Sequence, residues 1–305
     1  MASSITVRAP CSTANLGPGF DVFGLALDAF YDVIRLRRSN GGIKIESSDS
    51  IPLVPSKNSA GVVVIEMARK FKIKSGLVLT IKKGVPAGYG MGSSAASAAA
   101  AAVAFDALFD LNLDRKTLVE FAGMGEKASA GSVHYDNVAA SVFGGFVIVR
   151  SNPLEIISIK PPKDLLLCVA IPRLAVPQKK TEVSRKVIPK KIKLSDHVHN
   201  LSNAATMVAG FINRDTKLIG KSVRDIIVEP ARQHLIPGFA KVKENSISAG
   251  ALGVTISGAG PSVIAFASRT SNPKKICDAM VAGFKSAKIN CKTIVCRPSK
   301  GAMIV

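Results

Sequence analysis

The chain has 305 residues, 47% of them hydrophobic, which is enough to build two domains of ordinary size. Its longest apolar run, residues 95–105, is too short to cross a bilayer, and no leading segment resembles a signal peptide. The five cysteines show no metal-binding spacing, and their odd number excludes a full disulfide framework, so we expect a cytoplasmic protein with reduced thiols.

The net charge of +20 is concentrated in the second half of the chain. Residues 1–154 hold 16 Lys and Arg against 12 Asp and Glu, whereas residues 155–305 hold 25 against 9. Such charge is typical of proteins that bind nucleic acid or an anionic small molecule, and also of a solvated basic surface. Because aromatic residues make up only 5% of the chain, stacking platforms for single strands are not evident.

Capping and turn signals divide the chain into strands and helices that do not alternate strictly. Asn58 or Ser59, Asp114, and Asn272 followed by Pro273 are each expected to begin a helix. The expected strands span residues 5–9, 31–37, 77–81, 146–149, 165–171, 250–256, 263–267 and 291–295. The expected helices span residues 59–71, the alanine-rich stretch that ends near 109, 114–128, 181–187, 195–212 and 273–287. The mixture indicates an α+β fold, and the change in charge places a domain boundary between residues 154 and 155.

The segment VPAGYGMGSSAASAAAAAVA (residues 85–104) joins three alternating glycines to two serines and an alanine run. Glycine allows sharp turns and close approach to a ligand, and alanine is the best helix former. The segment therefore predicts a glycine loop at a helix N-terminus, where free N–H groups and a partial positive charge suit phosphate. It matches neither the Walker loop nor the dinucleotide fingerprint. The alternative is a small-residue helix packed in a core.

Two further glycine motifs occur along the chain. The first, STANLGPGFDVFGLAL (residues 12–27), contains a Gly17-Pro18-Gly19 turn between a polar and an apolar stretch. The second, GALGVTISGAGPSVIAF (residues 250–266), contains a Ser257–Ser262 loop that either brings backbone close to a ligand or simply joins two strands. Each loop alone is weak evidence for a site, whereas three loops in this order are strong evidence.

With these motifs the chain resembles the GHMP small-molecule kinases, and within them the homoserine kinases. Residues 86–94, PAGYGMGSS, look like the ATP loop of that family, with Met91 where leucine is usual. Residues 10–27 look like the N-terminal homoserine-kinase motif, which is more specific than the ATP loop, and SGAGPS (257–262) matches the C-terminal motif. The stretches 134–137, HYDN, and 229–232, EPAR, also resemble homoserine kinases. The resemblance covers nearly the whole chain, from about residue 6 to 266.

This resemblance implies ATP-dependent phosphorylation of the side-chain hydroxyl of L-homoserine to O-phospho-L-homoserine, on the threonine pathway. It also implies a two-domain GHMP kinase fold. The N-terminal ATP-binding domain (1–154) would contain a left-handed βαβ crossover, against the usual right-handed rule, and the C-terminal domain (155–305) would be ferredoxin-like. ATP and the alcohol would lie in the cleft between them.

The resemblance assigns the nucleotide and its Mg²⁺ to the first domain. Residues expected to bind ATP are Pro86, Gly88, Gly90, Met91, Gly92, Ser93 and Ser94. Ser94 and Glu126 are expected to hold Mg²⁺, which prefers oxygen ligands, and with Asn137 they form the expected catalytic set. From the residues alone, a solvent-exposed glutamate on a helix is an equally good interpretation of Glu126.

Homoserine is a zwitterion, and its carboxylate suits the planar fork of arginine better than lysine. Arg232 and Arg185 are the candidates, although Arg185 lies in a basic run where surface exposure is the ordinary interpretation. Asp21 is expected to accept the ammonium group. Other residues expected to contact or orient the alcohol are Asn15, His134, Asn137, Thr181 and Gly258.

Several members of the family use an aspartate as the base, which makes Asp136 a rival to a mechanism in which the hydroxyl proton passes directly to phosphate. We favour the mechanism without a base. The alternative functions are another GHMP kinase acting on shikimate or mevalonate, a nucleotide or threonine sensor, or a basic nucleic-acid-binding protein. With the kinase function, no nucleic acid or membrane partner is expected, and a homodimer is possible.

Overall fold

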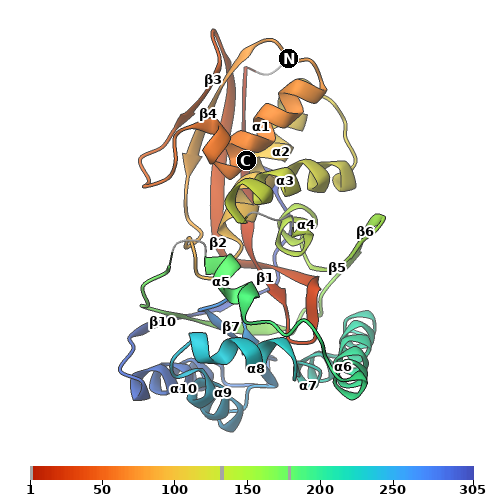
Figure 1. The fold of residues 1–305 in the computed structure, drawn as a ribbon, viewed down its shortest axis with the longest axis vertical. Coiled ribbons are helices and arrows are strands. Elements are labelled where there is room, and N and C mark those ends of the chain that lie inside the picture. Colours follow the sequence, from red (N-terminus) through yellow and green to blue (C-terminus); the bar gives the residue numbers. More distant parts are fainter. Residues whose placement is uncertain (1–2, 131–133, 178–179) are drawn as a thin grey trace.

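The computed structural model describes residues 3–130, 134–177 and 180–305. It contains two β-sheets, each covered by helices, with the first sheet in the upper part of Figure 1 and the second below it. This arrangement confirms the α+β fold expected from the sequence. The free thiols of all five cysteines remain unpaired. Within the described ranges, no helix combines the length and apolar character that a bilayer span needs.

The first sheet has the order β11-β1-β2-β4-β3, and β5 pairs with both β2 and β6. Its strands are β1 (Ser4–Asn15), β2 (Gly19–Ser39), β3 (Ile43–Glu46), β4 (Gly76–Lys82), β5 (Phe146–Ser151), β6 (Leu154–Ile159) and β11 (Met303–Ile304). β3 and β4 are parallel and are joined through helix α1, so they form a βαβ unit. The first sheet also contains β6 and β11, which lie beyond residue 153 in the sequence. The expected boundary between two domains at residues 154 and 155 stays a prediction.

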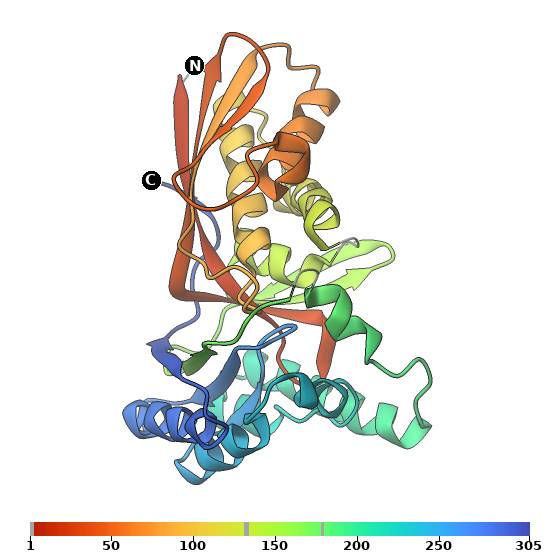
Figure 2. The same ribbon diagram turned by 60° about the vertical axis from the view of Figure 1, so that its left-hand side comes forward.

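Helices stack on one face of this sheet, as the turned view in Figure 2 shows. They are α1 (Ser59–Lys70), α2 (Ser93–Phe109), α3 (Arg115–Ala130) and α4 (Tyr135–Phe143), and η1 (Pro55–Lys57) is a short 3-10 turn. The alanine-rich α2 lies directly on β1 and β2, and α1 and α3 pack on its outer side. Residues 98–102 of α2 are all fully buried alanines. The small-residue core helix and the glycine loop are therefore the same element.

The second sheet has the order β10-β7-β9-β8 with every pair antiparallel, which is the ferredoxin-like arrangement. Its strands are β7 (Leu166–Pro172), β8 (Gly253–Ile256), β9 (Val263–Ala267) and β10 (Cys291–Cys296). Its helices are α5 (Lys180–Lys186), α6 (Leu194–Ile212), α7 (Thr216–Lys221), α8 (Val228–Arg232), α9 (Phe239–Ser248) and α10 (Pro273–Ser286), with the 3-10 turn η2 (Gln233–Leu235).

Alternating residues of the second sheet belong to two different cores. Leu167 and Phe266 join the core of the first sheet, whereas Cys168 and Ala265 pack with helices α9 and α10. The ring of Phe146 in β5 also stacks on Phe211 of α6, with centroids 3.9 Å apart. The shared core holds the two sheets together beside the functional site.

A return segment, residues 297–305, ties the end of the second sheet to the first. The backbone N–H of residue 302 donates to the Ser141 carbonyl at 2.8 Å, and that of Val305 donates to the Thr6 carbonyl at 3.0 Å. β11 pairs antiparallel with β1 at the outer edge of the sheet. The chain therefore leaves the first sheet after β6 and rejoins it through this segment.

Candidate functional site

A cleft of about 590 Å³ lies where the loops of the two sheets meet. The residues that line it include almost the whole set expected from the sequence. These are Asn15, Asp21, Gly88, Gly90, Met91, Gly92, Ser93, Ser94, Glu126, His134, Asn137, Thr181, Arg185, Arg232 and Gly258. Pro86 is not among the lining residues, although it begins the same loop. The structure thus brings together residues that lie up to 243 positions apart.

The glycine loop leads directly into the N-terminus of α2. Gly88, Gly90 and Gly92 all have left-handed backbone angles, with φ of 83°, 74° and 67°, which glycine adopts at little cost. Gly92 is the N-cap of α2, so the first N–H groups of this helix face the cleft without an intrahelical acceptor. This geometry suits the binding of phosphate.

Close approach to a ligand was the expected reason for these glycines, but the chain itself also occupies the space around them. A Cβ at Gly90 would overlap the carbonyl oxygens of Ser257 and Gly260, and one at Gly92 would overlap the Ser12 hydroxyl. The reason for glycine is therefore at least partly the packing of one loop on another.

The three glycine motifs meet at this point. The Ser257 hydroxyl donates to the Gly90 carbonyl at 2.8 Å, and the Asn15 side chain donates to the Gly258 carbonyl at 3.0 Å. The backbone N–H of Ser12 donates to the Met91 carbonyl at 3.1 Å. The motifs thus form one hydrogen-bonded seam that runs along the cleft.

Ser94 and Glu126 lie together at the end of the glycine loop. Ser94, in the first turn of α2, shares a side-chain hydrogen bond with Glu126 of α3. Burial raises the pKa of the Glu126 carboxyl, while the Ser94 hydrogen bond and the positive charge of Lys83 oppose this shift. A hydroxyl and a carboxylate beside a phosphate-binding helix end are oxygen donors of the kind that Mg²⁺ prefers, so these residues fit that ion.

On another wall of the cleft, Arg185 connects two of the residues expected to bind the alcohol. Its Nη2 atom lies 2.5 Å from Oδ1 of Asp21 and 2.9 Å from Nδ1 of His134. Burial and the nearby charge of Arg185 lower the pKa of His134, so its imidazole is neutral at pH 7. The Arg185–Asp21 pair is partly exposed, which leaves both groups accessible to a zwitterion.

Arg232 is buried and held firmly. Its Nε atom donates to the Ser184 carbonyl and its Nη1 atom to the Gly258 carbonyl, each at 3.1 Å. Burial and the neighbouring Arg185 lower its pKa to about 10, so the guanidinium remains charged at neutral pH. Both guanidinium groups lie 5.2 Å from the ring centre of Phe20, within the range of cation–π attraction.

Asp136 and Asn137 occupy the first turn of α4. The Asp136 Oδ1 atom accepts the backbone N–H of Asn137 at 2.7 Å, and the Asn137 Oδ1 atom accepts the Ser12 hydroxyl at 2.9 Å. Burial raises the pKa of Asp136 to about 7, and the charge of Asp21 acts in the same direction. The carboxyl of Asp136 therefore changes protonation near neutral pH. The Nδ2 atom of Asn137 also donates to Asp136 Oδ1 at 3.4 Å, so the side-chain amide of Asn137 is held from both sides.

Family models and known proteins match the chain along most of its length. Residues 58–145 match the GHMP kinase N-terminal domain and residues 207–286 the GHMP kinase C-terminal domain. A protein of Thermoplasma volcanium named homoserine kinase is 41% identical over 260 residues, which are 85% of this chain and 83% of that protein. The chain belongs to the GHMP kinase family.

Solved structures of other kinases superpose on nearly the whole chain. The crystal structure of homoserine kinase from Cytophaga hutchinsonii superposes with a TM-score of 0.93 at 38% identity, and covers 100% of this chain and 98% of that one. The mevalonate kinase of Methanococcus jannaschii superposes with a TM-score of 0.70 at 16% identity, covering 98% and 99%, which shows the shared fold alone.

Some residues of this GHMP kinase cleft were not expected from the sequence. They are Phe20, Lys57, Lys83 and Lys180, with Ser12 and Asp32 directly behind. Burial and the nearby Arg232 lower the pKa of Lys180 to about 7, and its ammonium donates to the Gly260 carbonyl. The excess of Lys and Arg over residues 179–193 was the one signal in the sequence for Lys180. Phe20 and Asp32 gave no signal because their partners are distant in sequence.

Proposed function

We propose that this GHMP kinase transfers the γ-phosphoryl group of ATP to the side-chain hydroxyl of L-homoserine. One observation carries the proposal: the glycine loop with Ser94 and Glu126 shares a single cleft with Arg185, Arg232 and Asp21. The first group suits phosphate and a hard cation, and the second suits an amino acid. The names of the similar proteins from Thermoplasma volcanium and Cytophaga hutchinsonii agree with this substrate.

The nucleotide side is supported by the free N–H groups at the start of α2. These donors would hold the phosphate oxygens, and Ser94 and Glu126 would hold Mg²⁺, which when bound neutralises charge that develops on the phosphates. Catalysis of phosphoryl transfer depends mainly on positioning of the reactants and on charge neutralisation. A loop of backbone N–H groups that is fixed to a core helix would position the phosphates.

The alcohol side is supported by the charge pattern around Phe20. The fixed guanidinium of Arg232 and the accessible one of Arg185 would bind the carboxylate, and Asp21 would bind the ammonium. Arg185 and Asp21 contact each other in this structure. A bound zwitterion would replace this contact with two ion pairs, one between its carboxylate and Arg185 and one between its ammonium and Asp21. Shikimate and mevalonate lack an ammonium and would leave Asp21 without this contact.

In the proposed reaction the hydroxyl proton passes to the transferred phosphate, and Asp136 orients Asn137. This role of Asp136 is supported by its Oδ1 atom, which already accepts the backbone N–H of Asn137 and is therefore less available to take the hydroxyl proton. A loose transition state needs little help from a base at the attacking oxygen. Asn137, held between Asp136 and Ser12, would then orient the hydroxyl.

The test is ADP release, coupled to a second enzyme, with a panel of alcohols at saturating ATP and Mg²⁺. We expect turnover with L-homoserine, and much lower kcat/KM with D-homoserine, shikimate and mevalonate. Greater turnover with shikimate or mevalonate would overturn the substrate. Absence of ATP binding, measured by calorimetry, together with salt-sensitive binding of a polynucleotide would favour the basic nucleic-acid-binding alternative.

A homodimer is a further part of the proposal, supported by an exposed apolar stripe on α6. Leu194, Val198 and Leu201 follow helical spacing and are 76%, 56% and 56% exposed. Leu201→Glu should give monomers in sedimentation velocity, whereas Ile247→Glu, an exposed site on α9, should not. Dimers that persist in Leu201→Glu would exclude this surface.

A further inference from the structure

A fully buried carboxylate lies behind the glycine loop, outside the set of residues assigned to nucleotide or alcohol. Asp32, in β2, has no exposed surface. Its Oδ1 atom accepts the backbone N–H groups of Gly84 and Val85, each at 3.0 Å. Its Oδ2 atom accepts the Ser97 hydroxyl at 2.6 Å and the ammonium of Lys83. The carboxylate therefore has four hydrogen-bond donors around it.

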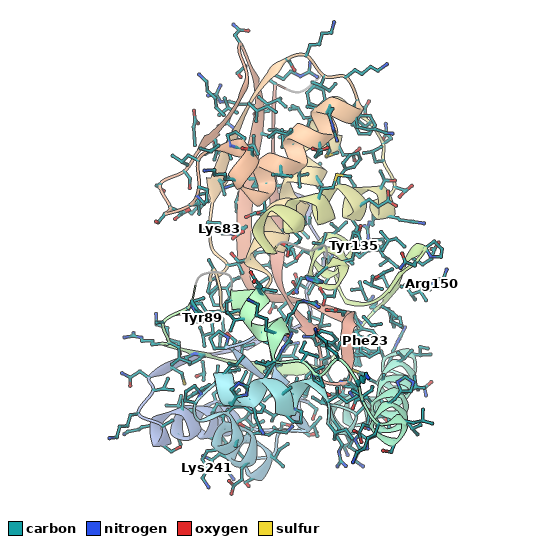
Figure 3. All side chains as sticks on the ribbon, in the orientation of Figure 1. Phe23, Lys83, Tyr89, Tyr135, Arg150 and Lys241 are labelled. Carbon is teal, nitrogen blue, oxygen red and sulfur yellow. The ribbon has the colours of Figure 1, made fainter. Side chains whose placement is uncertain are left out.

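The ammonium of Lys83 completes this cluster. Besides Asp32, it donates to the Ser93 carbonyl and to the Ser97 hydroxyl, each at 2.9 Å. An ammonium has three N–H donors, and these three contacts use all of them. Lys83 lines the cleft, and Figure 3 labels it at the end of β4, with Tyr89 farther along the same loop. Its charge is therefore paired with Asp32 rather than directed at a ligand.

The cluster joins the two ends of the glycine loop. Residues 83–85 begin the loop, and Ser93 and Ser97 lie in the first two turns of α2, where the loop ends. The segment 86–92, with its three left-handed glycines, lies between these two points. Because glycine backbone is flexible, its geometry depends on what holds the ends.

We propose that Asp32 is a positioning residue for nucleotide binding, acting through Lys83 and Ser97 as a clamp on both ends of the loop 86–92. The inference rests on the proposed use of this loop for the phosphates of ATP. Burying a carboxylate and an ammonium costs free energy unless each is paired and hydrogen-bonded. The clamp therefore favours the one loop conformation that satisfies all its groups, which aligns the N–H groups of the loop before the nucleotide arrives.

The test compares Asp32→Asn with Asp225→Asn. Asparagine retains the shape and the oxygen that accepts Gly84 and Val85, but it loses the charge that pairs with Lys83. Asp225 is a matched buried carboxylate, which accepts the N–H groups of residues 227–229 at the start of α8, the helix that carries Arg232. The readouts are calorimetric binding of MgATP without alcohol, separate KM values for ATP and homoserine, and thermal unfolding.

We expect Asp32→Asn to weaken MgATP binding at least about tenfold, the scale of a lost charged hydrogen bond, with KM for homoserine changed less than about threefold. Asp225→Asn should instead raise KM for homoserine and leave MgATP binding nearly unchanged. Ser97→Ala removes the hydroxyl that contacts both Asp32 and Lys83 but leaves their ion pair in place. It should therefore weaken MgATP binding by a smaller factor, which keeps the test valid where Asp32→Asn folds poorly.

Unchanged MgATP binding in folded Asp32→Asn and Ser97→Ala would overturn the inference. Equal losses for both substrates in Asp32→Asn would also overturn it, because they would indicate a general structural role. These outcomes differ from failure of the proposed function, in which the unmodified protein itself would bind no MgATP.

Discussion

Asp136→Asn separates the electrostatic role of this buried carboxyl from a catalytic one. Burial, followed by the charge of Asp21, raises the pKa of Asp136 from 3.8 to about 7. The folded protein therefore holds this proton more tightly than the unfolded chain does. The stabilisation is fully present below about pH 4 and is lost as the pH rises through 7. The asparagine side chain is neutral at every pH, so Asp136→Asn does not lose this stability as the pH rises.

The size of the effect follows from the shift. About three pKa units at about 1.4 kcal/mol each amount to about 4 kcal/mol, and the full burial of Asp136 leaves little solvent screening. We expect Asp136→Asn to gain stability relative to the unmodified protein on going from pH 4 to pH 8 by up to this amount. Any constant effect of the amide on the hydrogen bond to Asn137 cancels in this comparison.

Urea unfolding of both proteins at several pH values between 4 and 8 measures this difference. Asp225→Asn is the control, and it should be less stable at every pH because its partners are four N–H donors. A stability difference between Asp136→Asn and the unmodified protein that does not change with pH would refute the reasoning.

The kinetics of the same variant test the proton route. With transfer to phosphate, Asp136→Asn should lose less than about tenfold in kcat, and Asn137→Ala should lose more. A general base typically contributes about 10²–10⁴-fold. A loss of that size, with an ascending limb near pH 7 that disappears in Asp136→Asn, would make Asp136 the base.

Three other substitutions test the remaining walls of the cleft. Gly92→Ala places a Cβ on a left-handed residue against the Ser12 hydroxyl, so the free energy of unfolding should fall by at least about 1 kcal/mol and nucleotide affinity should fall with it, as measured by urea unfolding and calorimetry. Glu126→Gln should lower kcat at least about 10²-fold at saturating Mg²⁺ in the ADP-release assay. Arg232→Lys should weaken homoserine binding by about 1.5–3 kcal/mol in steady-state KM, with KM for ATP unchanged. Normal nucleotide affinity in Gly92→Ala, normal turnover in Glu126→Gln, or an effect of Arg232→Lys on ATP alone would contradict the corresponding role.

Local signals predicted three helices that begin with a side-chain cap, whereas α7, which begins after the cap Asp215, was missed. Asn58 accepts the N–H groups of residues 60 and 61, Asp114 that of Thr117, and Asn272 that of Lys275, as expected at all three sites. The Gly17-Pro18-Gly19 segment forms the predicted turn between β1 and β2, with φ of 88° at Gly17. These features depend on a few consecutive residues, which the sequence shows directly.

Features that depend on distant partners were not predictable in the same way. β2 continues for 21 residues, although only its second half shows a strand pattern, because pairing with β1 and β5 completes it. The edge strands β3, β6 and β11 are short and were missed. The contact between Asp32 and Lys83 spans 51 positions, so nothing near either residue indicates it. The resemblance supplied the cleft residues, but not the groups behind them.

The return segment 297–305 also affects the order in which the protein can mature on the ribosome. β1 is synthesised long before its outer neighbour β11. Until residues 303–304 arrive, β1 presents unpaired backbone groups of the kind that promote aggregation. Folding of the first sheet can begin early, yet its completion must wait until β11 has been translated. Chaperone binding to nascent chains should therefore persist until this segment emerges.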